Sequence, residues 1–69
     1  MDRSLNPYKQ AGKKLLQVRE SLGWSQAEMA AIVHVSQTSV SRWERGLDAP
    51  DIVQADAIER MTGKDLRVF

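Results

Sequence analysis

The chain has 69 residues, a net charge of +1 and no cysteine, which limits it to one small domain with one core over residues 1–69. The lack of cysteine excludes disulfides and thiolate metal sites and favours a reducing compartment. No apolar run is long enough for a signal-peptide core or a membrane span, so we expect a cytoplasmic protein without a membrane partner.

Charge is distributed unevenly along the chain. Residues 1–47 carry seven Lys or Arg against four Asp or Glu, a net charge of +3, whereas residues 48–69 carry three against five, a net charge of −2. A basic front and an acidic back would turn one face of the domain toward a polyanion. Because the excess is small, we expect a single subunit to bind such a polyanion weakly.

The first helix is predicted from Asn6-Pro7, an N-cap followed by proline at the first helical position, to about Leu22, before Gly23. Its apolar stripe should face the core and comprises Ala11, Leu15, Val18 and Leu22. Gly12 costs the helix about 1 kcal/mol relative to alanine, so the first turn is expected to fray.

A second helix is predicted to start with the capping box S-x-x-E at Ser25 and Glu28. Trp24 and Met29 occupy the two positions of a hydrophobic staple, and the helix should end near His34. His34 is then expected to adopt a positive φ, which histidine tolerates better than most residues other than glycine. A lone histidine without any cysteine argues against a metal site, and we expect no cofactor.

A third helix is predicted from Ser36 through Arg45, with Gly46 as its stop, and its polar face is unusual. At 100° per residue, an arc of about 140° carries hydrogen-bonding side chains and no acidic one: Gln37, Thr38, Ser41, Arg42 and Arg45. Glutamine can pair with adenine and arginine with guanine through two hydrogen bonds, while serine and threonine accept several partners. The alternative is an ordinary solvated face, although such faces usually include Asp or Glu.

A fourth helix is predicted from about Asp51 to Thr62, after a loop at residues 47–50. Its apolar face comprises Ile52, Ala55, Ile58 and Met61. The only strand-like pattern lies in residues 66–69, within a tail that comprises residues 64–69. The predicted fold class is therefore all-α: a compact domain of four to five helices with a short extended C-terminal tail.

Residues 25–46 thus hold two short helices joined by a tight turn, the layout of a helix-turn-helix, whose second helix lies in the DNA major groove. The candidates to read bases are Gln37, Thr38, Ser41 and Arg42. The candidates to contact phosphates are Gln26, Ser25, Arg45 and Lys13. For Ser25 the alternative is capping alone, and for Lys13 the alternative is a general contribution to solubility.

Arg19 and Glu44 are interpreted as a structural ion pair. Arg19 lies beside the apolar stripe of the first helix, and Glu44 lies one turn after Val40, at the border of the buried face. A partly buried pair between them would lock the first helix to the third. The alternative is that Arg19 binds a phosphate.

The chain resembles the lambda-repressor-like, Cro/Xre-type helix-turn-helix family through SQAEMAAIVHVSQTSVSRWERG, with VRESLGW before it and DAPDIVQADAIERMTG after it. The resemblance covers about residues 9–63. It implies the interhelical ion pair described above and a double-stranded DNA ligand, with Gln26 on a phosphate and Arg45 on the backbone. The base-facing positions that it implies are Gln37, Thr38, Ser41 and Arg42. His34 departs from the family, which usually has glycine in this turn.

The same resemblance implies a homodimer on a near-palindromic operator, with half-sites about 34 Å apart. The dimer could form through the fourth helix, the tail or DNA itself; Leu66, Val68 and Phe69 could pair across a twofold axis or cover their own core.

We expect a sequence-specific transcriptional regulator, such as a small phage or prophage repressor. The alternative is an antitoxin-type protein that neutralises a protein partner and represses its own operon. One histidine and no cysteine assemble no nucleophile–base pair, so we expect neither an enzyme nor a small-molecule ligand.

Overall fold

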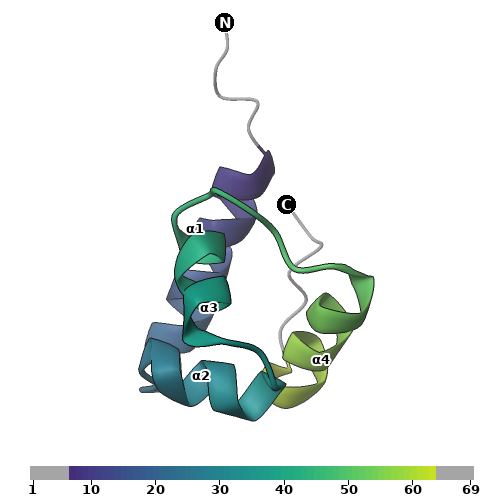
Figure 1. Ribbon diagram of the computed structural model, residues 1–69. Coiled ribbons are helices and arrows are strands. Elements are labelled where there is room, and N and C mark those ends of the chain that lie inside the picture. The colour runs from purple at the N-terminus through teal and green to yellow at the C-terminus, as the bar shows by residue number, and fades with distance from the viewer. Residues whose placement is uncertain (1–6, 64–69) are drawn as a thin grey trace, which may run out of the picture.

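The computed structural model describes residues 7–63, which form four helices and contain no strand. These are α1 (Pro7–Ser21), α2 (Gln26–Val33), α3 (Gln37–Glu44) and α4 (Ile52–Thr62). α3 packs against α1 and α2, and α4 packs against α2 (Figure 1). The prediction of an all-α fold is confirmed. The predictions for Asn6 and for residues 64–69, including the pairing of the tail, concern residues outside the described range.

One hydrophobic core joins the four helices, and α3 contributes to it with one face only. The buried apolar side chains are Leu15, Val18, Met29, Ala30, Val33, Val40, Trp43 and Ile58. Trp24 is partly buried against this core, to which the fully buried Met29 belongs, and this arrangement is compatible with the predicted staple. Because Val40 and Trp43 fix the inner face of α3, the polar residues of its opposite face lie toward solvent.

Reciprocal capping boxes start α2 and α4. The Ser25 hydroxyl accepts a hydrogen bond of 3.0 Å from the Glu28 amide, and the Ser25 amide donates one of 2.7 Å to the Glu28 carboxylate. Asp51 and Gln54 make the same two bonds, of 2.8 and 3.0 Å. These local bonds explain why both helices begin where the sequence predicts.

The turn between α2 and α3 is closed by His34 in the left-handed conformation, with φ 62° and ψ 46°. This confirms the predicted positive φ. The Val35 amide donates to the Ala30 carbonyl oxygen over 2.9 Å, the bond typical of a left-handed helix end. Ser36 then caps α3 by accepting from the Ser39 amide, so only three residues separate the two helices.

Gly12 lies at a close contact between α1 and the end of α3. A Cβ at this position would overlap the Trp43 carbonyl oxygen and would lie 3.0 Å from the Glu44 carbonyl oxygen. The residue is buried, and α1 is helical from Pro7. Glycine at this position allows the two backbones to approach each other.

Part of the predicted apolar faces is not buried. Leu22, Ile52 and Met61 are 39%, 84% and 53% exposed, and these predictions were wrong. Leu22 lies beyond the last residue of α1, where the chain turns at Gly23. The other two lie near the ends of α4, which buries only Ile58 fully.

Candidate functional site

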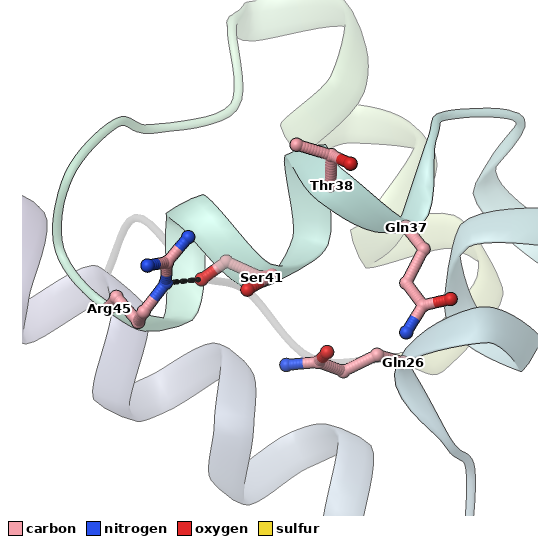
Figure 2. A pocket seen from close by; sticks show the side chains of 5 residues that line it. All are labelled: Gln26, Gln37, Thr38, Ser41 and Arg45. Atoms are coloured by element: carbon pink, nitrogen blue, oxygen red, sulfur yellow. Dashed lines mark hydrogen bonds between the residues drawn. The ribbon is translucent and has the colours of Figure 1, made fainter.

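An open pocket of about 310 Å³ lies between the outer face of α3 and the beginning of α2 (Figure 2). Its lining residues are Gln26, Gln37, Thr38, Ser41 and Arg45. All five are residues for which the sequence predicts a contact with bases or phosphates, and none is acidic. The structure brings these residues together, while their contact with DNA remains a prediction.

The polar groups of this pocket are spread along its length. The amide groups of Gln26 and Gln37 point into the space between α2 and α3, and Arg45 lies at the far end of α3 (Figure 2). Arg45 Nε donates to the Ser41 carbonyl oxygen over 3.3 Å. A guanidinium group has five N–H groups, so this bond leaves most of the Arg45 donors for a ligand.

Arg42 does not line the pocket. Its Nε lies 3.9 Å from the Asp48 carboxylate, and the two side chains are 46% and 58% exposed. An exposed ion pair at this distance contributes little to the free energy of folding. Arg42 can therefore exchange Asp48 for another partner, and its proposed contact with a base is compatible with this geometry.

Ser25 and Lys13 also lie outside the pocket lining. The Ser25 hydroxyl is used in the cap of α2, which agrees with the capping alternative for this residue. Lys13 is exposed on α1. A phosphate contact by either side chain has no further support from their surroundings.

The beginning of α2 forms one wall of the site. Its capping box uses the amides of Ser25 and Glu28. The amides of Gln26 and Ala27 lie between them, in the first turn, where a helix offers no acceptor. Together with the positive end of the helix dipole, such amides favour an anion beside the pocket.

Arg19 and Glu44 are in direct contact at the border of the core. Arg19 Nε and Nη2 lie 2.6 and 3.1 Å from the two carboxylate oxygens, and the side chains are only 13% and 6% exposed. Arg19 Nη1 donates to the Trp24 carbonyl oxygen over 2.8 Å. The hydrogen bond to Glu44 raises the pKa of Arg19 above its ordinary value. With all three guanidinium nitrogens used, the geometry favours the ion pair over a phosphate contact.

The sequence analysis missed a third partner of the Glu44 carboxylate. Gln26 Nε2 donates to Glu44 Oε1 over 2.8 Å. The two residues are 18 positions apart and lie in different helices, and no spacing rule links them. The pocket residue Gln26 is thereby connected to the ion pair that holds α1 to α3.

Residues 7–63 contain no group of three His, Cys, Asp or Glu side chains that could share a metal ion. Within the same range no helix has both the length and the apolar character needed to cross a bilayer.

A helix-turn-helix family model matches residues 15–69, which is most of the chain and includes α2, α3 and α4. The comparisons with curated proteins and with solved structures gave no match. The matched region contains every residue that lines the pocket.

Proposed function

The chain belongs to the Cro/Xre-like helix-turn-helix family and is a DNA-binding transcriptional regulator, and we propose that it is a repressor that binds a near-palindromic operator as a homodimer. It would act in the bacterial cytoplasm, where it would block access of polymerase to the promoter. No chemical step is involved. The observation that carries the proposal is the pocket on the outer face of α3, lined by polar and cationic side chains without an acidic one.

In this proposal α3 enters the major groove. Gln37, Thr38 and Ser41 project from its outer face, and Arg42 lies farther around the same exposed surface. Each well-placed pair of hydrogen bonds to a base edge discriminates against the wrong base by about 1–3 kcal/mol. A short recognition helix therefore reads only a few base pairs, and a second copy doubles the length of the site.

The phosphate contacts are proposed on both sides of α3. Gln26 and the free amides at the beginning of α2 would hold one phosphate, and Arg45 would hold another near the end of α3. Such contacts fix the register of the protein on the duplex without reading sequence. The phosphate contacts would thereby place the same α3 residues opposite the same bases in each half-site.

The proposal of a homodimer is supported by apolar side chains at the beginning of α4. Ile52 and Val53 are 84% and 77% exposed, which is unusual for adjacent branched residues of a helix. Two copies joined through this end of α4 would bury both side chains. Twofold symmetry of the dimer would then be matched by a near-palindromic operator.

Selection of ligands from a random duplex library with the purified full chain tests this function. We expect enrichment of a near-palindrome whose half-sites are separated by about one helical turn, 10–10.5 base pairs. An enriched site without symmetry would contradict the homodimer, and no enrichment at all would contradict sequence-specific binding.

The second candidate is an antitoxin-type role, and the same exposed side chains of α4 favour it, because they could pack against a different protein. The two proposals differ in what covers Ile52 and Val53. Self-association of the purified chain supports the homodimer. A chain that stays monomeric until a co-expressed toxin from the same operon is added supports the antitoxin role.

A further inference from the structure

The carboxylate of Glu44 lies where α1, α2 and α3 meet, and it accepts hydrogen bonds from two side chains. Arg19 donates to both oxygens, over 2.6 and 3.1 Å, and Gln26 donates to Oε1 over 2.8 Å. The Glu44 side chain is 6% exposed, so these partners replace its hydration almost completely. An ion pair between two helices needs no third donor, and Gln26 comes from the helix that flanks the pocket.

The bond to Glu44 restricts how Gln26 can present its amide. One N–H group is directed toward the buried carboxylate, which leaves one N–H group and the carbonyl oxygen for the pocket. A free glutamine side chain samples several rotamers, and ordering it on binding costs conformational entropy. The hydrogen bond to a charged acceptor orders the side chain before a ligand arrives.

Arg19 has a second effect on this arrangement. An uncompensated carboxylate beside the pocket would repel a phosphate and would leave a buried charge without a counterion. The two hydrogen bonds from Arg19 supply the opposite charge. Glu44 can therefore accept from Gln26 without making the pocket unfavourable for an anion.

We propose that Glu44 is a positioning residue for DNA binding: it holds the Gln26 amide in the conformation that receives a phosphate, and the Arg19–Glu44 pair thus connects the core with the DNA contact. This inference rests on the proposed function of the pocket. It differs from a purely structural role of the ion pair, in which Gln26 would bind phosphate equally well without Glu44.

Two double variants separate the hydrogen-bond acceptor from the ion pair. R19M/E44Q removes both charges and retains an amide oxygen for Gln26, whereas R19M/E44L removes the charges and the acceptor. Replacing a buried pair by neutral side chains of similar volume often preserves stability, and thermal unfolding of both variants checks this. With the duplex enriched by the wild-type chain as probe, we expect R19M/E44L to bind roughly tenfold more weakly than R19M/E44Q. Equal affinities of the two folded variants would overturn the proposal.

A Gln26→Ala substitution in the wild type, in R19M/E44Q and in R19M/E44L completes a double-mutant cycle. We expect it to weaken binding by roughly tenfold in the wild type and in R19M/E44Q, and to change little in R19M/E44L, where Gln26 is no longer held. Arg45→Ala is the matched control, because Arg45 lines the same pocket and bonds to Ser41, not to Glu44. Its loss of affinity should be the same in every background. A loss for Gln26→Ala that is equally independent of background would overturn the proposal.

NMR spectroscopy of the wild-type chain without DNA tests the bond itself and requires no variant to fold. The side-chain amide protons of Gln26 should be resolved and protected from exchange, whereas those of Gln17, which is exposed on α1, should not. Exchange of Gln26 as fast as that of Gln17 would overturn the proposal. If the wild-type chain enriches no duplex, the proposed function fails, and this measurement still shows whether Glu44 holds Gln26.

Discussion

Lys9 lies directly against Gly46, two residues after the end of α3. A Cβ at Gly46 would stand 2.7 Å from Lys9 Cγ and 3.1 Å from Lys9 Cα, closer than carbon atoms of side chains normally approach. Gly46 is buried and has φ 75°, a left-handed conformation that glycine adopts without strain. A side chain at position 46 would therefore force Lys9 and the beginning of α1 to shift away from the end of α3.

Gly46→Ala should consequently lower the free energy of unfolding by about 2–4 kcal/mol, from the left-handed conformation and from the contact with Lys9. Gly23→Ala is the control, because Gly23 has nearly the same φ, 74°, and a Cβ added there would meet no atom of the described residues within 4 Å. It should cost only about 1–2 kcal/mol. Chemical denaturation measures both. Equal losses would show that the approach of Lys9 does not constrain position 46.

Glu44→Ala should destabilise the fold by about 3–5 kcal/mol, because it leaves the nearly buried Arg19 guanidinium without its counterion. The control is Arg60→Ala, which breaks the exposed pair of Arg60 and Asp56, 3.0 Å apart on α4. We expect this change to stay within about 0.5 kcal/mol. The comparison needs only thermal or urea unfolding of the three proteins. Similar midpoints for both variants would argue against a stabilising role of the Arg19–Glu44 pair.

The helix boundaries were predictable because their determinants are local in sequence. The capping boxes at Ser25 and Asp51 and the glycine after α1 each depend on residues within one turn of the chain. Four of the five lining residues were predictable for a similar reason, since Gln37, Thr38, Ser41 and Arg45 share an arc of one helix and must share a face. The same arc also predicts Arg42, which does not line the pocket, whereas Gln26 comes from α2 and was predicted from the start of that helix.

Features that depend on contacts between helices were not predictable. From helix propensity alone, Gly12 is expected to destabilise α1. In the fold, however, the Trp43 carbonyl oxygen lies where a Cβ of residue 12 would be. Ile52 has the spacing of a core residue, but its burial depends on which helix lies opposite. The bond from Gln26 to Glu44 joins two helices whose relative placement no local pattern contains.

Arg42→Ala should change base preference. Arg42 is exposed on α3, and its ion pair with Asp48 is long and exposed, so the substitution should leave stability nearly unchanged. If Arg42 reads a base, the substitution should weaken the free energy of binding to the best operator by about 1–3 kcal/mol and should relax base selection at one operator position. Binding to a randomised operator library measures it. Identical relative affinities across the library would rule out the base contact.

Arg45→Ala provides the contrast for Arg42. If Arg45 holds a phosphate, its removal should weaken binding to all sequences by a similar factor and should reduce the slope of log affinity against log salt by about 0.9. A change in base preference with an unchanged salt slope would instead assign Arg45 to a base.

Ile52→Ser together with Val53→Ser should weaken self-association at least about tenfold, because these exposed side chains would become buried in the proposed dimer. The stability of the monomer should change little, since neither residue contributes to the core. Sedimentation equilibrium gives the association constant. Leu22→Ser, which removes an exposed apolar side chain just after α1, is the control and should leave association unchanged. Equal association of all three proteins would place the interface outside the beginning of α4.

His34→Gly should stabilise the fold, by up to about 1 kcal/mol. His34 has φ 62°, a left-handed conformation that costs a residue with a side chain about 1–2 kcal/mol of folding free energy. Glycine removes this strain, but it also raises the conformational entropy of the unfolded chain, which offsets part of the gain. The exposed imidazole contributes no core contact that would be lost. Ala31→Gly, on the exposed side of α2 one turn earlier, is the control and should destabilise by about 1 kcal/mol. Urea unfolding should therefore show that the free energy of unfolding rises for His34→Gly and falls for Ala31→Gly. Shifts of the same sign would mean that the imidazole stabilises the turn in a way that compensates for the left-handed backbone.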